Sequence, residues 1–166
     1  MELIALSMED LPDCHALLAD SVAALPDEVY SLSQRLAWAG VWDEATRLQW
    51  ASRLAQAWGV CLRQEGEMAG FAWLSHAGEF DMLYVAPWAQ RHGLGMAMID
   101  HLEALAAKAG VVTLHAWASQ VARPLFEKAA YVMMRPNSTI RDGVELANWL
   151  MVKGDWQEHP AMEETA

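Results

Sequence analysis

The sequence has few cysteines, few basic residues and no long apolar run. Cys14 and Cys61 are the 2 cysteines among 166 residues, too few for a disulfide framework or a cysteine-based zinc site. The 11 Lys and Arg residues face 22 Asp and Glu residues, so the formal net charge is −11. A nucleic-acid partner is disfavoured because basic residues are needed to neutralise phosphodiesters. No segment reaches the roughly 18 continuous apolar residues of a membrane span, so no membrane association is expected.

The first residues lack the pattern of a signal peptide. The stretch MELIALSMEDLPD has neither a basic end nor an apolar run, and together with the scarcity of cysteine this indicates a cytoplasmic protein. The six histidines show no metal-ligand spacing, so no metal is expected. With 54% apolar residues and 9 tryptophans, the chain can bury a sizeable core. We expect a single domain over residues 1–154 and a polar tail over residues 155–166.

Hydrophobic periodicity predicts helices and strands in alternating order. The three segments between residues 60 and 85 alternate apolar and polar residues and are separated by glycine turns, as expected of antiparallel strands. The predicted strands cover residues 2–6, 60–64, 68–76, 79–85, 111–116, 131–135 and 144–152, and the predicted helices cover residues 11–25, 27–39, 43–58, 94–109 and 119–130. The fold class is therefore α/β (α+β), with a mixed, mostly antiparallel sheet of about six to seven strands flanked by helices.

One stretch, VAPWAQRHGLGMAMIDHLEALAAKAG, joins a strand to a helix through two glycines. Gly93 and Gly95 allow a close approach of the backbone, and a side chain at either position would block that approach. The helix that follows directs unpaired N–H groups and a partial positive charge toward the same place. The stretch therefore predicts an anion site, most simply for a phosphate.

Two common phosphate-binding patterns do not fit this loop. A Walker loop requires Lys and Ser or Thr after its last glycine, and here Met96 and Ala97 follow. A dinucleotide loop requires a small residue where Met98 stands, and the next strand, VVTLHAW, has no acidic residue at its end. The third pattern is Gln-x-x-Gly-x-Gly, which begins at Gln90 shortly after a Val-x-Pro sequence.

This third pattern resembles the Gcn5-related N-acetyltransferase (GNAT) family. Further similar features are the antiparallel strands before it, the Val-x-Pro sequence, the helix-strand pair after it and the segment ARPLFEKAAYV. The resemblance extends from the first strand to Lys153 and is closest to the bacterial YafP-type branch. It implies a GNAT acyl-CoA N-acyltransferase fold and direct transfer of an acetyl group from acetyl-CoA to a primary amine of a small molecule or peptide.

The resemblance also implies where acetyl-CoA binds. Its pyrophosphate would lie on backbone N–H groups of the glycine loop, with side-chain contacts added there, and its pantetheine arm would lie along the strand before the loop. The implied cosubstrate-binding residues are Leu83, Tyr84, Val85, Gln90, Arg91, His92, Gly93, Leu94, Gly95, Met96, Ser119 and Phe126.

The transfer requires a base and an oxyanion donor. An amine with a pKa of about 10.4 is charged at neutral pH and must lose a proton before it attacks. By period two, Glu79, Asp81, Leu83 and Val85 share one strand face, with Tyr84 on the other. Glu79 corresponds in position to the catalytic glutamate of the histone-modifying branch and is the predicted base, with Asp81 or water as alternatives. The backbone N–H of Leu83 is the predicted oxyanion donor.

The family's usual general acid, a tyrosine, is replaced by Phe126. The thiolate of CoA, with a pKa of about 8.5, can leave unaided or through water, and Tyr84 and Tyr131 are possible substitutes. The replacement also leaves an alternative function open, a catalytically weak CoA-binding module that acts as a sensor or interaction domain.

The resemblance implies that the chain segment between the first and second strands shapes the acceptor pocket. Tyr30, Gln34 and Trp38 stand at intervals of four and are the predicted substrate-binding residues, although aromatic residues at helical spacing also occur in cores. An aromatic pocket with acidic surroundings would suit a cationic amine or an amine with an apolar body. We expect a monomer or a homodimer.

Overall fold

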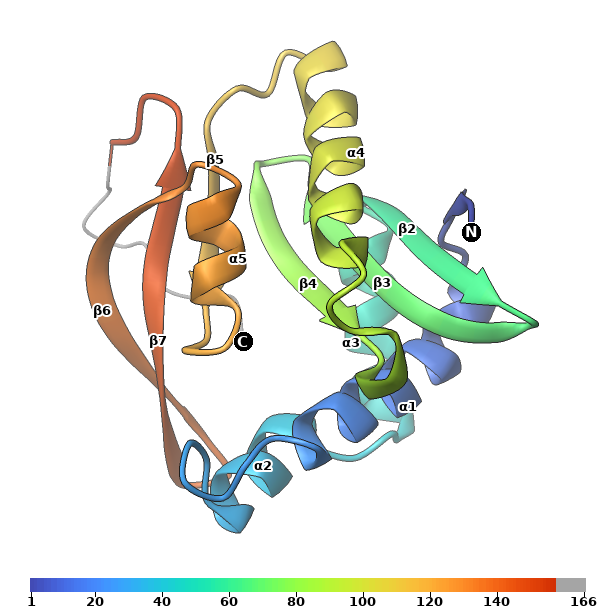
Figure 1. Ribbon diagram of the computed structural model, residues 1–166, viewed down its shortest axis with the longest axis vertical. Helices are drawn as coiled ribbons and strands as arrows, with labels where there is room; N and C mark the ends of the chain where they lie inside the picture. Colours follow the sequence, from blue (N-terminus) through green and yellow to red (C-terminus); the bar gives the residue numbers. More distant parts are fainter. Residues whose placement is uncertain (158–166) are drawn as a thin grey trace.

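A single mixed β-sheet of seven strands organises the protein, in the order β1-β2-β3-β4-β5-β7-β6 (Figure 1). The computed structural model describes residues 1–157. The strands are β1 (Leu3–Ala5), β2 (Ala57–Gln64), β3 (Glu67–Ser75), β4 (Glu79–Val85), β5 (Leu114–Ala118), β6 (Val132–Arg141) and β7 (Val144–Lys153). The helices are α1 (Leu11–Ala23), α2 (Leu32–Ala39), α3 (Glu44–Leu54), α4 (Leu94–Lys108) and α5 (Arg123–Lys128), with short 3-10 turns at Met8–Asp10 and Pro87–Ala89. The predicted fold class is confirmed.

Helices cover both faces of the sheet (Figure 1). On one face, Trp50 of α3 packs against the rings of Phe71 and Trp73 of β3, at centroid distances of 6.5 and 5.6 Å. On the other face, Gly70 of β3 lies against Met98 of α4, whose Cε would be 3.1 Å from a Cβ at Gly70. The core therefore has two layers, one on each side of the sheet. Within residues 1–157, no helix is long and apolar enough to cross a bilayer.

The sheet opens between β4 and β5. These two strands are parallel and pair at Glu79 with His115 and at Phe80 with Ala116. Beyond Phe80 they diverge, and α2 lies below the opening in the view of Figure 1. The second half of β4 therefore has an edge that β5 does not cover.

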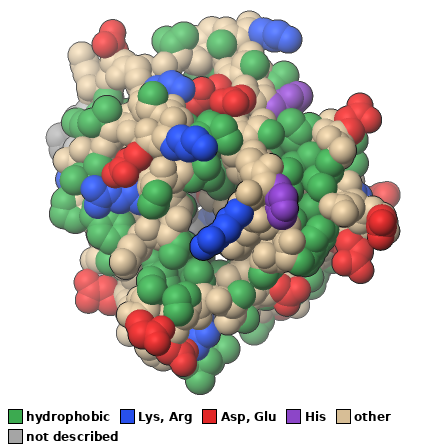
Figure 2. All heavy atoms as spheres, in the orientation of Figure 1, with side chains coloured by type: hydrophobic (Ala, Val, Ile, Leu, Met, Phe, Trp, Pro, Cys, Tyr) green, Lys and Arg blue, Asp and Glu red, His purple; other side chains and the backbone are tan. Residues whose placement is uncertain are grey.

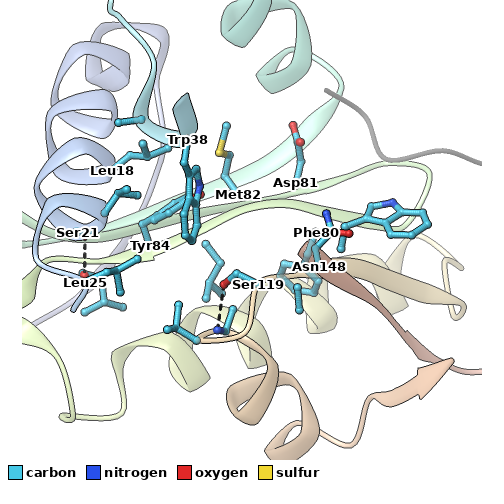
Figure 3. A pocket seen from close by; sticks show the side chains of 18 of the residues that line it. Leu18, Ser21, Leu25, Trp38, Phe80, Asp81, Met82, Tyr84, Ser119 and Asn148 are labelled. Carbon is cyan, nitrogen blue, oxygen red and sulfur yellow. Dashed lines mark hydrogen bonds between the residues drawn. The ribbon is translucent and has the colours of Figure 1, made fainter. Parts of the chain in front are cut away.

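A β-bulge in β4 changes which residues share a face. Trp73 pairs with Met82 and Leu74 pairs with Phe80, so Asp81 is an extra residue in the ladder. Asp81 and Met82 therefore extend to the same side of β4, as Figure 3 shows. The prediction of one shared face for both carboxylates with Leu83 and Val85 is wrong.

The α3 side of the sheet holds the side chains of Asp81 and Tyr84. Asp81 accepts a hydrogen bond from Trp73, and the ring of Tyr84 stacks on Phe71 at 5.6 Å. The side chains of Leu83 and Val85 point to the α4 side, because they pair with Ala72 and Gly70. Tyr84 thus lies on the same side as Asp81, in contrast to the sequence prediction.

Several predicted elements have other bounds in the structure; the predicted helix 119–130, for example, is confined to Arg123–Lys128, and the predicted strand 111–116 spans Leu114–Ala118. The second helix begins at Leu32, because Ser31 caps it in a box with Gln34, and the third ends at Leu54, so that Trp58 belongs to β2. Residues 136–143, PNSTIRDG, lie between two predicted strands and were expected to form a loop, but β6 continues to Arg141. The turn consists of Asp142 and Gly143, which have φ values of 48° and 73°. Such a two-residue turn connects antiparallel strands directly. Most of the predicted polar tail, residues 155–166, lies outside the described residues.

Candidate active site

A cavity of about 1110 Å³ occupies the opening between β4 and β5. Its wall includes the start of α4 on one side of the sheet, residues of α3 on the other side, and residues of the strands β6 and β7. Figure 2 shows a hollow near the centre of one face, with a Lys or Arg side chain across its edge and a histidine nearby. The cavity therefore connects the two faces of the sheet.

The N-terminus of α4 forms one end of this cavity. Gly93 is the N-cap residue, with φ 78°, and no side chain caps the helix. Arg91 also has a positive φ, of 65°. The first N–H groups of a helix have no carbonyl partner within it, and Leu94, Gly95 and Met96 line the cavity. This end of the cavity therefore has the donors and the positive helix terminus that an anion requires.

The two glycines of the loop differ in their surroundings. A Cβ at Gly93 would have no atom within 4 Å, whereas a Cβ at Gly95 would lie 2.8 Å from Cδ2 of Leu125 in α5. The close packing of α4 on α5 thus gives a reason for Gly95 that does not involve a ligand. Gly93 is the position where a side chain would extend into open space at the cavity wall.

The open edge of β4 presents backbone groups to the cavity. The N–H of Ala86 donates to the carbonyl of Ala69 in β3, at 2.8 Å. Because backbone groups alternate along a strand, the N–H and C=O groups of Leu83 and Val85 point to the opposite edge, where β5 has diverged. The carbonyl of Val85 accepts hydrogen bonds there from Ser21 Oγ at 3.1 Å and from Gln90 Nε2 at 3.3 Å.

Asp81 is one of two carboxyl groups that β4 contributes to the cavity wall. Its Oδ2 accepts a hydrogen bond from Trp73 Nε1 at 2.8 Å, and its Oδ1 lies 3.5 Å from Arg53 Nη1. The side chain is 11% exposed. Burial raises the pKa of Asp81 above its usual value, although the charges of Arg53 and Arg141 and the Trp73 hydrogen bond act in the opposite direction.

Glu79 lines the same cavity two residues earlier in β4. Its backbone N–H donates to Ser75 Oγ at 3.0 Å. Its carboxylate Oε2 lies 3.7 Å from Nε2 of His115, the residue with which it pairs in β5. Glu79 is therefore located where the two strands separate, at the closed end of the opening.

Three aromatic side chains connect the two halves of the sheet. The hydroxyl of Tyr30 accepts a hydrogen bond from the backbone N–H of Gln120, at 3.1 Å. Its ring packs edge-on against Trp38 at 5.2 Å, and Trp38 Nε1 donates to the hydroxyl of Tyr84 at 3.0 Å. Tyr30, Trp38 and Tyr84 all line the cavity, and Figure 3 shows Trp38 across Tyr84. Ser119, also in the wall, accepts the N–H of Ala122 with its Oγ.

Two predicted site residues do not contribute to the described cavity wall. The side chain of Gln34 accepts the N–H of Ser31 at 2.9 Å and donates to the carbonyl of Glu145 at 3.3 Å. Its spacing of three from a serine is typical of a capping box, which explains its role in helix α2. The ring Nδ1 of His92 lies 3.3 Å from the carbonyl of Ala89, within its own loop. The structure thus gives Gln34 a structural role in place of the predicted contact with substrate.

Phe126 belongs both to the core and to the cavity wall. It is 4% exposed, and its ring packs edge-on against Phe80 and Tyr131 at 5.7 and 5.1 Å. The hydroxyl of Tyr131 donates to Glu103 Oε1 at 2.9 Å, and Tyr131 is not part of the described wall. Burial raises the pKa of Tyr131, so this residue is poorly suited to protonate a leaving group.

Sequence reasoning missed two arginines in the cavity wall. Arg53 comes from α3 and Arg141 from the end of β6. Arg141 could not be placed because residues 136–143 were predicted to form a loop, and Arg53 had no pattern that separated it from a solvated helix face. Among residues 1–157, no cluster of His, Cys, Asp or Glu side chains is arranged to hold a metal ion.

A sheet that opens beside a helix N-terminus, with carboxyl groups at the other end of the opening, defines a site for a long anionic ligand and a second, smaller reactant. Residues 39–153 match the sequence family described as the acetyltransferase (GNAT) domain. The chain belongs to this family of acetyltransferases. The YafP-type resemblance stays a prediction.

Solved structures support this assignment. A GCN5-related N-acetyltransferase structure from Rhodopseudomonas palustris, whose description also reads "Aminotransferase, Class-II", has 33% identity and a TM-score of 0.83, with 92% of this chain and 94% of that chain covered. A phosphinothricin acetyltransferase from Sinorhizobium meliloti, in complex with acetyl-CoA, has 18% identity and a TM-score of 0.71 over 99% and 92% of the two chains. The PaiA N-acetyltransferase from Thermoplasma acidophilum, in complex with coenzyme A, has 15% identity and a TM-score of 0.72 over 92% and 99%. A search of curated protein sequences gave no significant match.

Proposed function

We propose that this protein transfers the acetyl group of acetyl-CoA directly to a primary amine of a small molecule or peptide. The observation that carries the proposal is the continuity of the cavity, which extends from the N-terminus of α4, through the opening between β4 and β5, to Glu79 and Asp81. A cosubstrate can enter from one face of the sheet and an acceptor from the other, and the two reactants would meet in the opening.

The residues of the first half of the cavity fit acetyl-CoA. Its pyrophosphate would bind the N–H groups of Leu94, Gly95 and Met96, next to Arg91. Its pantetheine arm would take the place of a strand along the open edge of β4. The Leu83 N–H, which points to that edge, is the donor that would stabilise a tetrahedral oxyanion, and such a donor typically contributes about 3–4 kcal/mol.

Glu79 is the better candidate for the general base. Both oxygens of Asp81 already have partners, Trp73 and Arg53, so an amine would have to compete with these donors for the carboxylate. Glu79 lines the cavity at the point where β4 and β5 separate. There its carboxylate would reach the amine of an acceptor in the opening, directly or through one water molecule. Asp81 is the alternative.

The leaving thiolate does not require the tyrosine that Phe126 replaces. A thiol with a pKa of about 8.5 is a good leaving group near neutral pH. Tyr84 is the candidate acid, because the bulge brings it to the same side of β4 as Asp81 and it lines the cavity.

A covalent acyl-enzyme is not part of this mechanism. Cys14 and Cys61 are buried outside the described cavity wall, and burial raises the pKa of both thiols. The amine therefore attacks the thioester in a ternary complex. We place the protein in the cytoplasm, where free thiols of this kind persist.

Release of the CoA thiol from acetyl-CoA tests this proposal, with a panel of amines, amino acids and short peptides, and with thermal unfolding on the same samples. We expect the parent protein to release the thiol only in the presence of an acceptor. Glu79→Gln should have a lower rate, mainly at low pH, and the surface variant Glu44→Gln should keep the rate of the parent. Stabilisation by acetyl-CoA without release from any acceptor would favour the CoA-binding module, the alternative that Phe126 leaves open. A full rate of Glu79→Gln at every pH would transfer the role of base to Asp81 or to water.

A further inference from the structure

Arg53 is a nearly buried cation that faces the cavity. Its side chain is 16% exposed, and it lines the cavity from the last turn of α3. Among the described residues, the carboxylate found within 4.0 Å of its guanidinium is Asp81, at 3.5 Å between Nη1 and Oδ1. A guanidinium has five N–H donors, so this single long contact leaves most of its capacity to bind an anion unused.

The surroundings of Arg53 contain a second cation. Arg141, at the end of β6, lines the same cavity and lies near enough for its charge to act on Asp81. Asp142, in the adjoining turn, and Glu79 are further charged residues of the wall. The sequence suggested a uniformly acidic acceptor site. In the structure, guanidinium groups lie beside carboxyl groups in this part of the cavity.

Arg53 is not positioned to bind the phosphates of CoA. Its partner Asp81 extends from β4 on the α3 side of the sheet, whereas α4 packs on the opposite side. The four residue steps from Asp81 to Val85 also separate the two sites by about 13 Å along the strand. An anionic group that binds Arg53 would therefore be part of the acceptor.

We infer that the acceptor is a free amino acid or a related amino-carboxylic acid, whose carboxylate binds Arg53 while its amine lies against Glu79. This inference rests on the proposed acetyltransferase function and specifies its substrate class. Arginine suits the role because its planar fork pairs with both oxygens of a carboxylate. Arg53 would then determine acceptor specificity, and Arg141 would add positive potential.

Matched acceptors test the inference. Each amino acid of a panel is compared with its amide, which keeps the side chain and the amine but lacks the carboxylate. The parent protein should favour the amino acid in kcat/KM by about 10- to 100-fold, the range for a hydrogen bond to a charged group. In Arg53→Gln the preference should disappear, mainly through a higher KM for the amino acid, and Arg53→Lys should restore only part of it. The decisive quantity is the change in this preference between the parent and Arg53→Gln, because differences in intrinsic amine reactivity cancel in that comparison.

Arg47→Gln is the matched control on the same helix. Arg47 pairs with Glu44 at the surface, so its substitution should leave the preference for the amino acid over its amide unchanged. Equal losses for amino acid and amide in Arg53→Gln would show that Arg53 acts only by holding Asp81, and would overturn the inference. Amine acetylation by the parent without preference for a carboxylate would overturn it too, yet leave the proposed function intact. Binding of acetyl-CoA without acetylation of any acceptor would instead refute the function itself.

Discussion

Gly93 provides the sharpest test of the cosubstrate site, because α4 has a glycine of nearly equal conformation at each end. Gly93 has φ 78° and Gly110 has φ 81°, and neither has any atom within 4 Å of the position of a Cβ. Alanine at either position should therefore cost the same backbone strain, without a clash. Gly93 alone of the two lies in the described cavity wall.

The stability cost of each substitution follows from the backbone. A non-glycine residue in the left-handed region costs about 1–2 kcal/mol, and the lower entropy of the unfolded alanine chain offsets about 0.4–1 kcal/mol. A net loss of about 1 kcal/mol should lower Tm by about 2–4 °C in a chain of this size. Gly93→Ala and Gly110→Ala should therefore show similar Tm values in the absence of ligand.

Their affinities for acetyl-CoA should differ. Calorimetric titration should give Gly110→Ala a parental Kd and Gly93→Ala a Kd at least about tenfold higher, or about 1.4 kcal/mol, because its Cβ occupies space next to the helix N–H groups. Gly93→Arg, folded, should not bind measurably. Parental affinity in Gly93→Ala and in folded Gly93→Arg would refute the assignment of α4 as the phosphate site.

Four further substitutions test two carboxyl groups and two hydroxyls. Burial raises the pKa of Asp81 in the folded protein above its value in the unfolded chain. The folded protein therefore loses stability relative to the unfolded chain as pH rises above the unfolded pKa. Asp81→Asn removes this loss, so the Tm of the variant should increase relative to that of the parent from pH 3.5 to 7. The exposed cap Asp43 has a pKa lowered by N–H donors, so its contribution is lost as pH falls, and Asp43→Asn should show the opposite trend in the same scans. Tyr84→Phe should lower kcat with little change in the Kd of acetyl-CoA, and a parental kcat would mean that the thiolate leaves without Tyr84. Tyr30→Phe removes the acceptor of the Gln120 N–H and should cost about 0.5–1.5 kcal/mol in chemical denaturation, whereas an unchanged free energy of unfolding would show that this contact contributes nothing.

Much of the fold could be predicted because local patterns dominate it. The two glycines and the amphipathic helix behind them indicated the loop and α4, and tight glycine turns indicated the antiparallel strands β2 to β4. The fold class and the family are confirmed. The predicted helix boundaries were wrong where a side chain caps the backbone. Ser31, for example, caps α2, so this helix begins at Leu32 and not at residue 27.

The geometry of the site could not be read from period two alone. The bulge at Asp81 depends on how β4 pairs with β3, which no pattern within β4 reveals. It moves Asp81 and Tyr84 to one side of the sheet, away from Leu83 and Val85. Arg53 and Arg141 likewise reach the cavity from elements far apart in the sequence, so only the tertiary structure brings them together.

The opening between β4 and β5 also has a consequence for how this protein can change in evolution. The groups assigned to acetyl-CoA lie in the second half of β4 and the start of α4, whereas Arg53 and Arg141 come from α3 and β6. Substitutions in α3 or β6 can therefore alter the acceptor without touching the cosubstrate loop. A descendant of this chain could acquire a new substrate through a few changes in that wall while its requirement for acetyl-CoA stayed constant.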